Sequence, residues 1–139
     1  MSKITARTTR TIMPVVYSDF FTDFSMSSST GQLNKKTNEN AVKQSIRNLL
    51  LTDFYERPFH PEIGSGLKGL MFENYTPGVI PRAEKAIEEV FDKYEPRANL
   101  IKTRITASPD RNALKATIYF RIINTEETAS VDVILERTR

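Results

Sequence analysis

The sequence predicts an α+β domain of two layers, in which an antiparallel three-stranded C-terminal sheet packs on two main helices, with an extended N-terminal arm. Three observations predict this class. Apolar residues recur at helical spacing in two segments between residues 39 and 95. From residue 100 onward, apolar and polar residues alternate in three consecutive segments, as they do in half-buried strands. Short polar turns separate these three segments, so consecutive strands should pair as antiparallel hairpins.

The first helix is predicted over residues 39–52. Asn38 is a suitable N-cap residue, and Glu39 suits the positive end of the helix dipole. One face of this helix carries the apolar residues Val42, Ile46, Leu49 and Leu50. Residues 56–66 contain two prolines and two glycines, which prevent a regular element and predict a structured loop. One or two helical turns are predicted after this loop, from the apolar residues Leu67, Leu70 and Met71.

The second helix is predicted to begin at Pro81, because the fixed φ of proline suits the first helical position. Pro96 ends it, since the residue before a proline is pushed out of the α region. The residues predicted to face inward are Ala83, Ile87, Val90, Phe91 and Tyr94. Charged residues occupy the opposite face, so this helix should cover one side of the sheet.

The three strands each have one predicted apolar face. In the first strand this face holds Ile101, Ile105 and Ala107. In the second it holds Leu114, Ala116, Ile118, Phe120 and Ile122, and in the third Val131, Val133 and Leu135. The predicted strands are residues 100–107, 112–123 and 130–137, and the turns are residues 108–112 and 124–128.

Size and composition exclude several classes of protein. The 139 residues are enough for one ordinary domain, and 39% hydrophobic with 27% charged residues excludes a mostly disordered chain. No apolar run is long enough to span a membrane, so no membrane partner is expected. The absence of cysteine and of a secretory leader indicates synthesis in a reducing cytoplasm. With one histidine and five glycines, we expect no metal, no cofactor and no small-molecule substrate.

Residues 1–37 are predicted to form the extended arm, and residues 38–139 the folded domain. The net charge of +3 comes from the first 38 residues, which contain five Lys and Arg residues and two Asp residues. These charges are scattered and have no stacking ladder of aromatic residues, so nucleic acid is not an expected partner. The stretch from Val15 to Phe24 is too apolar for a solvated linker. We expect it to dock in extended form, either on its own domain or on a partner.

Two parts of the sequence carry a resemblance to a known family. The first is the run from Glu39 to Leu50, followed by Arg57-Pro58-Phe59-His60-Pro61-Glu62-Ile63-Gly64 and Leu70-Met71-Phe72-Glu73-Asn74. The second is Tyr94-Glu95-Pro96-Arg97, between the second helix and the first strand. Together they resemble the baseplate wedge or sheath-initiator family of contractile-tail bacteriophages, which is also described as lysozyme-like and is related to the type VI secretion baseplate component. The resemblance covers roughly residues 38–137.

The resemblance implies a non-enzymatic structural role. It implies six copies per baseplate around the tail tube, attached to baseplate wedge proteins and serving as a platform from which the tail sheath protein assembles. The expected location is the tail baseplate of a virion, after synthesis in the host cytoplasm. The residues agree with this role, because a three-stranded sheet has two edges of unpaired backbone groups to which another chain can add a strand.

The expected partner-binding residues form three groups, each with an alternative structural role. Glu95, Pro96 and Arg97 could present a carboxylate and a guanidinium to a wedge protein, or could pair within their own domain, for example with Arg57 or Glu62. Arg57, Phe59 and Glu62 could form a second wedge-facing surface with Phe59 as the anchor, or a cover in which Phe59 and Ile63 are core. The outer edge formed by Val131, Val133, Ile134 and Leu135 could be covered by the sheath or by the N-terminal arm.

A cell-wall glycan hydrolase is the alternative function. It would need two carboxylates, one of them with a raised pKa in an apolar pocket. The candidates are Asp53, Glu56 and Glu62, each near a basic residue or a turn, and the chain has no tryptophan for a sugar-binding cleft. His60 is expected to be an ordinary loop residue. The sequence therefore predicts no catalytic residue.

Overall fold

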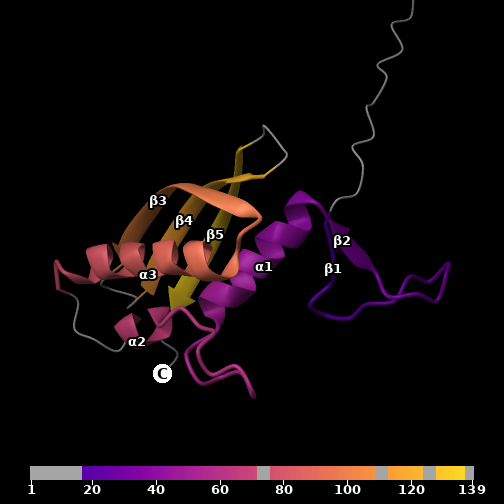
Figure 1. Ribbon diagram of the computed structural model, residues 1–139, viewed down its shortest axis with the longest axis horizontal. Coiled ribbons are helices and arrows are strands. Elements are labelled where there is room, and N and C mark those ends of the chain that lie inside the picture. Colours follow the sequence, from indigo (N-terminus) through magenta and orange to yellow (C-terminus); the bar gives the residue numbers. More distant parts are fainter. Residues whose placement is uncertain (1–16, 72–75, 109–112, 124–127, 137–139) are drawn as a thin grey trace, which may run out of the picture.

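A computed structural model describes residues 17–71, 76–108, 113–123 and 128–136 (Figure 1). It has two layers, because α1 and α3 cover one face of a three-stranded antiparallel sheet and no described element covers the opposite face. The predicted α+β class is confirmed. In chain order the elements are β1 (Ser18–Phe20), β2 (Lys35–Thr37), α1 (Glu39–Leu51), α2 (Leu67–Met71), α3 (Val79–Tyr94), β3 (Ala98–Ser108), β4 (Ala113–Ile122) and β5 (Thr128–Glu136).

The C-terminal sheet has the strand order β3-β4-β5, and both pairs are antiparallel. On β4 the predicted alternation is confirmed, because Leu114, Ala116, Ile118, Phe120 and Ile122 are all buried. On β5 the predicted inward residues Val133 and Leu135 are buried and Val131 packs against the core. The predicted turns fall largely on residues 109–112 and 124–127, which lie outside the described residues, as does Arg137.

The predicted inward face of β3 is wrong at Ile101. A β-bulge between Leu100 and Lys102 places two residues of β3 opposite one residue of β4. The extra residue reverses the alternation, so that Leu100 packs against the core while Ile101 is 54% exposed. Beyond the bulge the predicted pattern returns, with Ile105 against the core. Ala107 belongs to the strand, but its side chain lies outside the described part.

The core lies between the two helices and the inner face of the sheet. All four apolar residues predicted on the face of α1 are buried, and so are the four aliphatic and aromatic residues of α3 that precede Tyr94 in the predicted set. The rings of Phe91 and Phe120 meet with centroids 6.0 Å apart, which joins α3 to the central strand. α3 begins at Val79, two residues before the predicted start at Pro81. Pro81 is tolerated there, because the first N–H groups of a helix have no partner within the helix.

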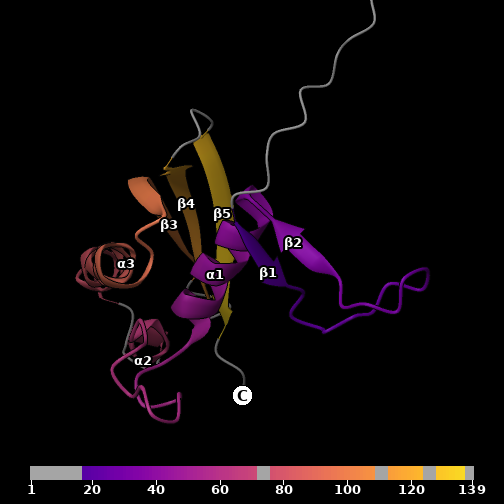
Figure 2. The same ribbon diagram turned by 45° about the vertical axis from the view of Figure 1, so that its right-hand side comes forward.

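Part of the N-terminal arm forms a hairpin that the sequence analysis did not predict. β1 and β2 pair as a separate two-stranded antiparallel sheet, with Ser18 opposite Thr37. Figure 2 shows this hairpin beside α1, with its connecting loop extending away from the body. Tyr17 packs against the core, and the Nε2 of Gln44 on α1 donates to the backbone oxygen of Phe20 at 2.6 Å. This described part of the arm therefore docks on its own domain, whereas Val15 and Val16 lie outside the described residues.

Candidate protein-binding site

The segment Glu95-Pro96-Arg97, called here the Glu95–Arg97 junction, links α3 to β3. The Glu95 side chain is 1% exposed and accepts two parallel hydrogen bonds from Arg97, from Nε to Oε1 at 2.6 Å and from Nη2 to Oε2 at 2.9 Å. Arg97 keeps 33% of its side chain exposed. The hydrogen bond to Glu95 raises the pKa of Arg97 above its ordinary value. The two residues therefore pair with each other, and the suggested pairing with Arg57 or Glu62 is not seen.

The Glu95–Arg97 junction also connects the arm to the core. The guanidinium of Arg97 lies 5.6 Å from the centre of the Tyr17 ring, close enough for a cation–π contact. Its backbone oxygen accepts from the N–H of Ile123 at 2.9 Å, beside the end of β4. Because Glu95 is buried, the surface that this junction offers to a partner consists of Pro96 and the open side of Arg97.

Residues 53–66, called here the 53–66 loop, are closed at their base by a serine and a glycine. Ser65 is 5% exposed, and its Oγ donates to the backbone oxygen of Leu50 at 2.7 Å. Its N–H donates to the oxygen of Thr52, the C-cap residue of α1, at 3.0 Å. A Cβ on Gly64 would lie 2.6 Å from backbone atoms of both Asp53 and Phe54. The two ends of the loop therefore touch where a side chain at residue 64 has no room.

The tip of the 53–66 loop holds aromatic side chains in water. Phe59 is 96% exposed and Tyr55 is 85% exposed. Both have left-handed backbone angles, with φ of 69° and 67°, which cost an L-residue about 1–2 kcal/mol each. The N–H of Tyr55 donates to the oxygen of Pro61 at 2.9 Å and keeps the tip folded. Phe59 is therefore not a core residue, as one alternative had it, whereas Ile63 does pack against the core.

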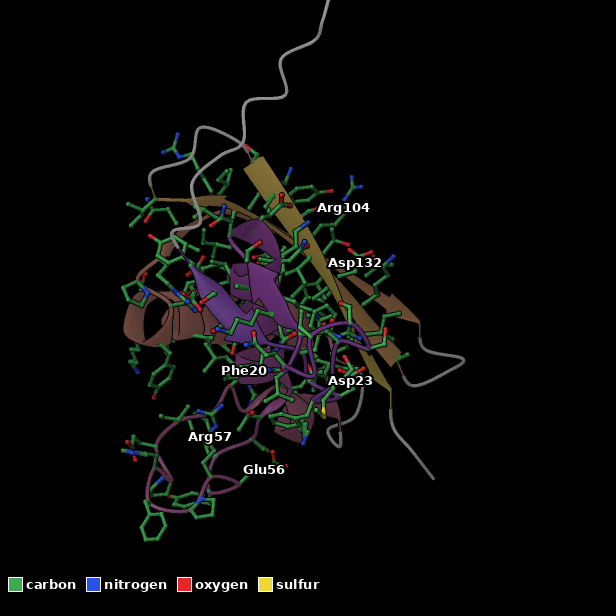
Figure 3. All side chains as sticks on the ribbon, turned by 90° about the vertical axis from the view of Figure 1, so that its right-hand side faces the viewer. Phe20, Asp23, Glu56, Arg57, Arg104 and Asp132 are labelled. Carbon is green, nitrogen blue, oxygen red and sulfur yellow. The ribbon has the colours of Figure 1, made fainter. Side chains whose placement is uncertain are left out.

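Hydrogen bonds from α2 and α3 hold this loop in place. Glu56 Oε1 accepts from Lys68 Nζ of α2 at 2.6 Å, and Oε2 accepts from the N–H of Asp53 at 2.9 Å. The Tyr94 hydroxyl, at the end of α3, donates to the backbone oxygen of Glu62 at 2.7 Å. Figure 3 shows Glu56 and Arg57 on this loop, below the helices. Arg57 also lines a cavity of about 280 Å³ with residues of β1, α1 and α3.

Glu56 and Glu62 do not have the environment of a glycosidase general acid. The hydrogen bond from Lys68 lowers the pKa of Glu56. For Glu62, a hydrogen bond from its own backbone N–H comes first and one with His60, at 3.2 Å, second, and both lower the pKa. A general acid of a glycosidase needs a raised pKa in an apolar pocket, which is the opposite environment.

The outer edge of β5 is open in the described part of the chain. β5 pairs with β4 alone, and the described residues of the arm form their own sheet instead of covering this edge. Val133 and Leu135 point into the core, so the edge presents backbone groups and the Ile134 side chain, which is 56% exposed. Figure 3 shows Asp132 on the sheet face that points away from the helices. Asp132 Oδ2 lies 3.2 Å from Lys115 Nζ on β4.

The described residues contain neither a candidate membrane span nor a metal-binding cluster. No helix among the described residues has both the length and the apolar character that crossing a bilayer requires. The same residues contain no cluster of three or more His, Cys, Asp or Glu placed to hold a metal ion.

The sequence did not predict Tyr17 and Tyr55 as site residues. The apolar stretch before Phe24 pointed toward Tyr17, but no local signal indicates a left-handed backbone at Tyr55.

A protein-family model matches most of the folded domain. The model of the family described as "Baseplate wedge protein gp25" matches residues 36–127. Baseplate wedge protein gp25 of Enterobacteria phage T4 is 32% identical over 84 residues, which cover 60% of this chain and 64% of the T4 protein. The match thus spans slightly less than two thirds of that relative. The match to the family model begins within β2 and includes α1, the 53–66 loop and the Glu95–Arg97 junction.

Solved structures share the fold at low sequence identity. A protein described as a candidate tail lysozyme from Geobacter sulfurreducens superposes with a TM-score of 0.65 and 21% identity, covering 83% of this chain and 96% of that chain. A chain of the anti-feeding prophage baseplate superposes with a TM-score of 0.61 and 22% identity, covering 86% and 85%. A chain of the postcontracted pyocin R2 baseplate gives a TM-score of 0.50 and 18% identity, covering 82% and 98%.

Proposed function

We propose that this chain, which belongs to the baseplate wedge protein gp25 family, is a structural subunit of a contractile-tail baseplate that holds wedge proteins and starts the sheath. Its place is the tail baseplate. The observation that supports sheath initiation is the outer edge of β5, with which no described strand pairs and near which Ile134 is exposed. The protein acts by binding neighbouring chains, in six copies around the tail tube, after synthesis in the host cytoplasm.

The edge of β5 is the proposed contact for the tail sheath protein. An added strand would satisfy the backbone N–H and C=O groups that β5 leaves unpaired on this side. It would also cover Ile134, whose apolar side chain is costly to leave in water. Val131, Val133 and Leu135 contribute by fixing the strand to the core, since Val133 and Leu135 point inward and Val131 packs against it.

The 53–66 loop and the exposed side of the Glu95–Arg97 junction are the proposed contacts for wedge proteins. Phe59 is the anchor, because its ring is almost wholly in water and its backbone is held in place by the braced loop. Arg57 and Glu62 lie on either side of Phe59 in the loop and supply the polar rim. Pro96 and Arg97 add a second polar contact, on the link that follows Tyr94.

A charge placed on the β5 edge tests the sheath contact. We expect Ile134→Lys to leave the domain folded, because the side chain already lies largely in water, and to yield baseplates without polymerised sheath. Ile123→Lys is the matched control, since Ile123 is 41% exposed and lies just beyond the end of the central strand β4. Electron microscopy of particles carrying each variant gives the readout. Normal sheathed tails with Ile134→Lys would overturn the assignment of this edge.

The wedge contact is tested separately with Phe59→Ala. This substitution removes an exposed ring, so we expect normal unfolding behaviour but loss of the subunit from purified baseplates. Phe54→Ala provides the comparison, because Phe54 belongs to the same loop, is 45% exposed and lies against Gly66 at the base. Baseplates that retain the Phe59→Ala subunit at wild-type occupancy would exclude Phe59 as the anchor.

A further inference from the structure

A groove of about 660 Å³ lies between α3 and the outer strand β3, at the opposite side of the sheet from β5. Figure 2 shows α3 and β3 together at one side of the molecule, away from the β1–β2 hairpin. The helix wall comes from residues between Glu84 and Asp92, and the strand wall from residues between Ala98 and Thr103. The buried Glu95 and the exposed Pro96 also line the groove. We call this feature the α3–β3 groove.

The helix wall of the groove is acidic. Glu84, Glu88 and Asp92 are four residues apart along α3, so their carboxylates form one stripe on the groove side. None of the three has an ion-pair partner among the described residues, in contrast to Glu89 on the neighbouring face, which pairs with Lys93 at 3.5 Å. Like charges at this spacing destabilise a helix slightly. Lys102 is the one basic residue among those that line the groove.

The strand wall offers hydrogen-bonding groups. β3 is an edge strand, and no described strand pairs with its outer side, so part of its backbone N–H and C=O groups lack protein partners there. Thr103, which also lines the groove, has a buried Oγ1 with no hydrogen-bond partner. An extended chain lying in the groove could bond to this strand with its backbone while its side chains reach the carboxylates of α3.

We infer that the α3–β3 groove binds a basic, extended segment of a neighbouring protein chain. The acidic stripe selects Lys and Arg side chains, and the free edge of β3 selects an extended backbone. This inference rests on the proposed structural role for the presence of neighbouring chains, but it concerns a different strand from the one assigned to the sheath. It specifies that the chain bound in the α3–β3 groove is basic. Neither the family match nor the β5 edge gives the charge of a partner.

The inference is tested on the full chain with a short fluorescent peptide that alternates lysine with valine. We expect binding that weakens as ionic strength rises, and backbone amide protection in hydrogen exchange confined to residues 98–106. The triple variant Glu84→Gln, Glu88→Gln and Asp92→Asn should bind about tenfold more weakly, as expected for three partly exposed ion pairs. The matched peptide with glutamate in place of lysine should not bind.

Single variants provide the control on α3. Glu88→Gln should weaken peptide binding measurably, whereas Glu89→Gln, one residue along and off the groove, should leave it unchanged. Equal affinity for the triple variant and the wild type, or protection that falls on β5 instead of β3, would overturn the inference. Self-association of the chain through the groove would do so too, because the occupant would then be a second copy.

The outcome is separable from that of the proposed function. If particles carrying the triple variant assemble normally and the peptide does not bind, the groove assignment fails and the baseplate role stands. If the peptide binds as expected while Ile134→Lys particles remain fully sheathed, the groove stands and the assignment of the β5 edge fails.

Discussion

The Glu95–Arg97 junction and the 53–66 loop lie side by side, joined by the hydrogen bond from the Tyr94 hydroxyl to Glu62, yet they treat their key side chains in opposite ways. The junction buries a carboxylate and satisfies it internally with a bidentate guanidinium. In the loop, Tyr55 and Phe59 have left-handed backbone angles that are unfavourable for L-residues, and both aromatic rings are exposed to water. The first arrangement leaves no unpaired charge in the interior, and the second leaves exposed the rings at which we propose that a partner binds.

This difference decides what a mutation in each region reports. A change at Glu95 disturbs folding before it can report on a partner, because the side chain has almost no surface of its own. A change at Phe59 should leave folding nearly unaffected, because its side chain is almost wholly exposed, and it can therefore report on the proposed partner contact.

Glu95→Ala should have the largest effect. Removing one member of a buried pair leaves the other without its partner, which typically costs 3–5 kcal/mol. We expect about 3 kcal/mol, because Arg97 keeps 33% of its side chain in water and can be partly solvated. Urea unfolding measures this loss. Glu89→Ala, which removes an exposed pair with Lys93, should cost less than about 0.5 kcal/mol, and similar losses for both variants would contradict the structural role of Glu95.

Gly64→Ala should come next. Its Cβ would lie 2.6 Å from backbone atoms of Asp53 and Phe54, so the base of the loop must open by a shift of the main chain. We expect a loss of about 2 kcal/mol in the free energy of unfolding. Gly69→Ala is the control, because a Cβ there meets nothing within 4 Å and lies in α2. That variant should gain about 0.5 kcal/mol from helix propensity, so a neutral Gly64→Ala would show that the loop ends are not tightly packed.

Phe59→Gly should stabilise the isolated domain slightly. Glycine relieves the left-handed strain at a φ of 69°, and little buried surface is lost because the ring is 96% exposed. After the entropic cost of glycine, we expect a gain of about 0.5 kcal/mol. The denaturant midpoint should rise while binding to baseplates falls. A clear loss of stability instead would mean that the ring packs on the loop in solution.

The smallest expected effect is the pH dependence of the Glu56 contact. Its pKa is lowered in the folded state, chiefly by the hydrogen bond from Lys68, so the folded protein favours the charged form. The associated stability is therefore present above the ordinary glutamate pKa of about 4.3 and is lost as the pH falls through the lowered value. Unfolding of the wild type and Glu56→Gln should differ slightly at neutral pH and converge in acid. A difference that grows in acid would reverse the sign of this argument.

Much of the fold could be predicted from local sequence pattern. The apolar face of α1, the alternation of β4 and β5, the loop between α1 and α2, and the antiparallel order of the last three strands all follow from periods of 3.6 and 2 and from turn residues. The family motifs were also readable, because Arg57 to Gly64 and Glu95 to Arg97 are contiguous strings. These elements and motifs could be predicted from the sequence because each of them consists of consecutive residues.

Tertiary structure decided the features that join distant residues. The bulge that turns Ile101 outward depends on the partner strand β4, and the contact between Arg97 and Tyr17 joins residues far apart in the sequence. Whether Glu95 faces a partner or its own arginine, and whether Phe59 is core or surface, depended on where the rest of the chain packs. Local propensity specifies an element and its apolar face, but exposure and pairing are set by the elements packed against it, which no single segment encodes.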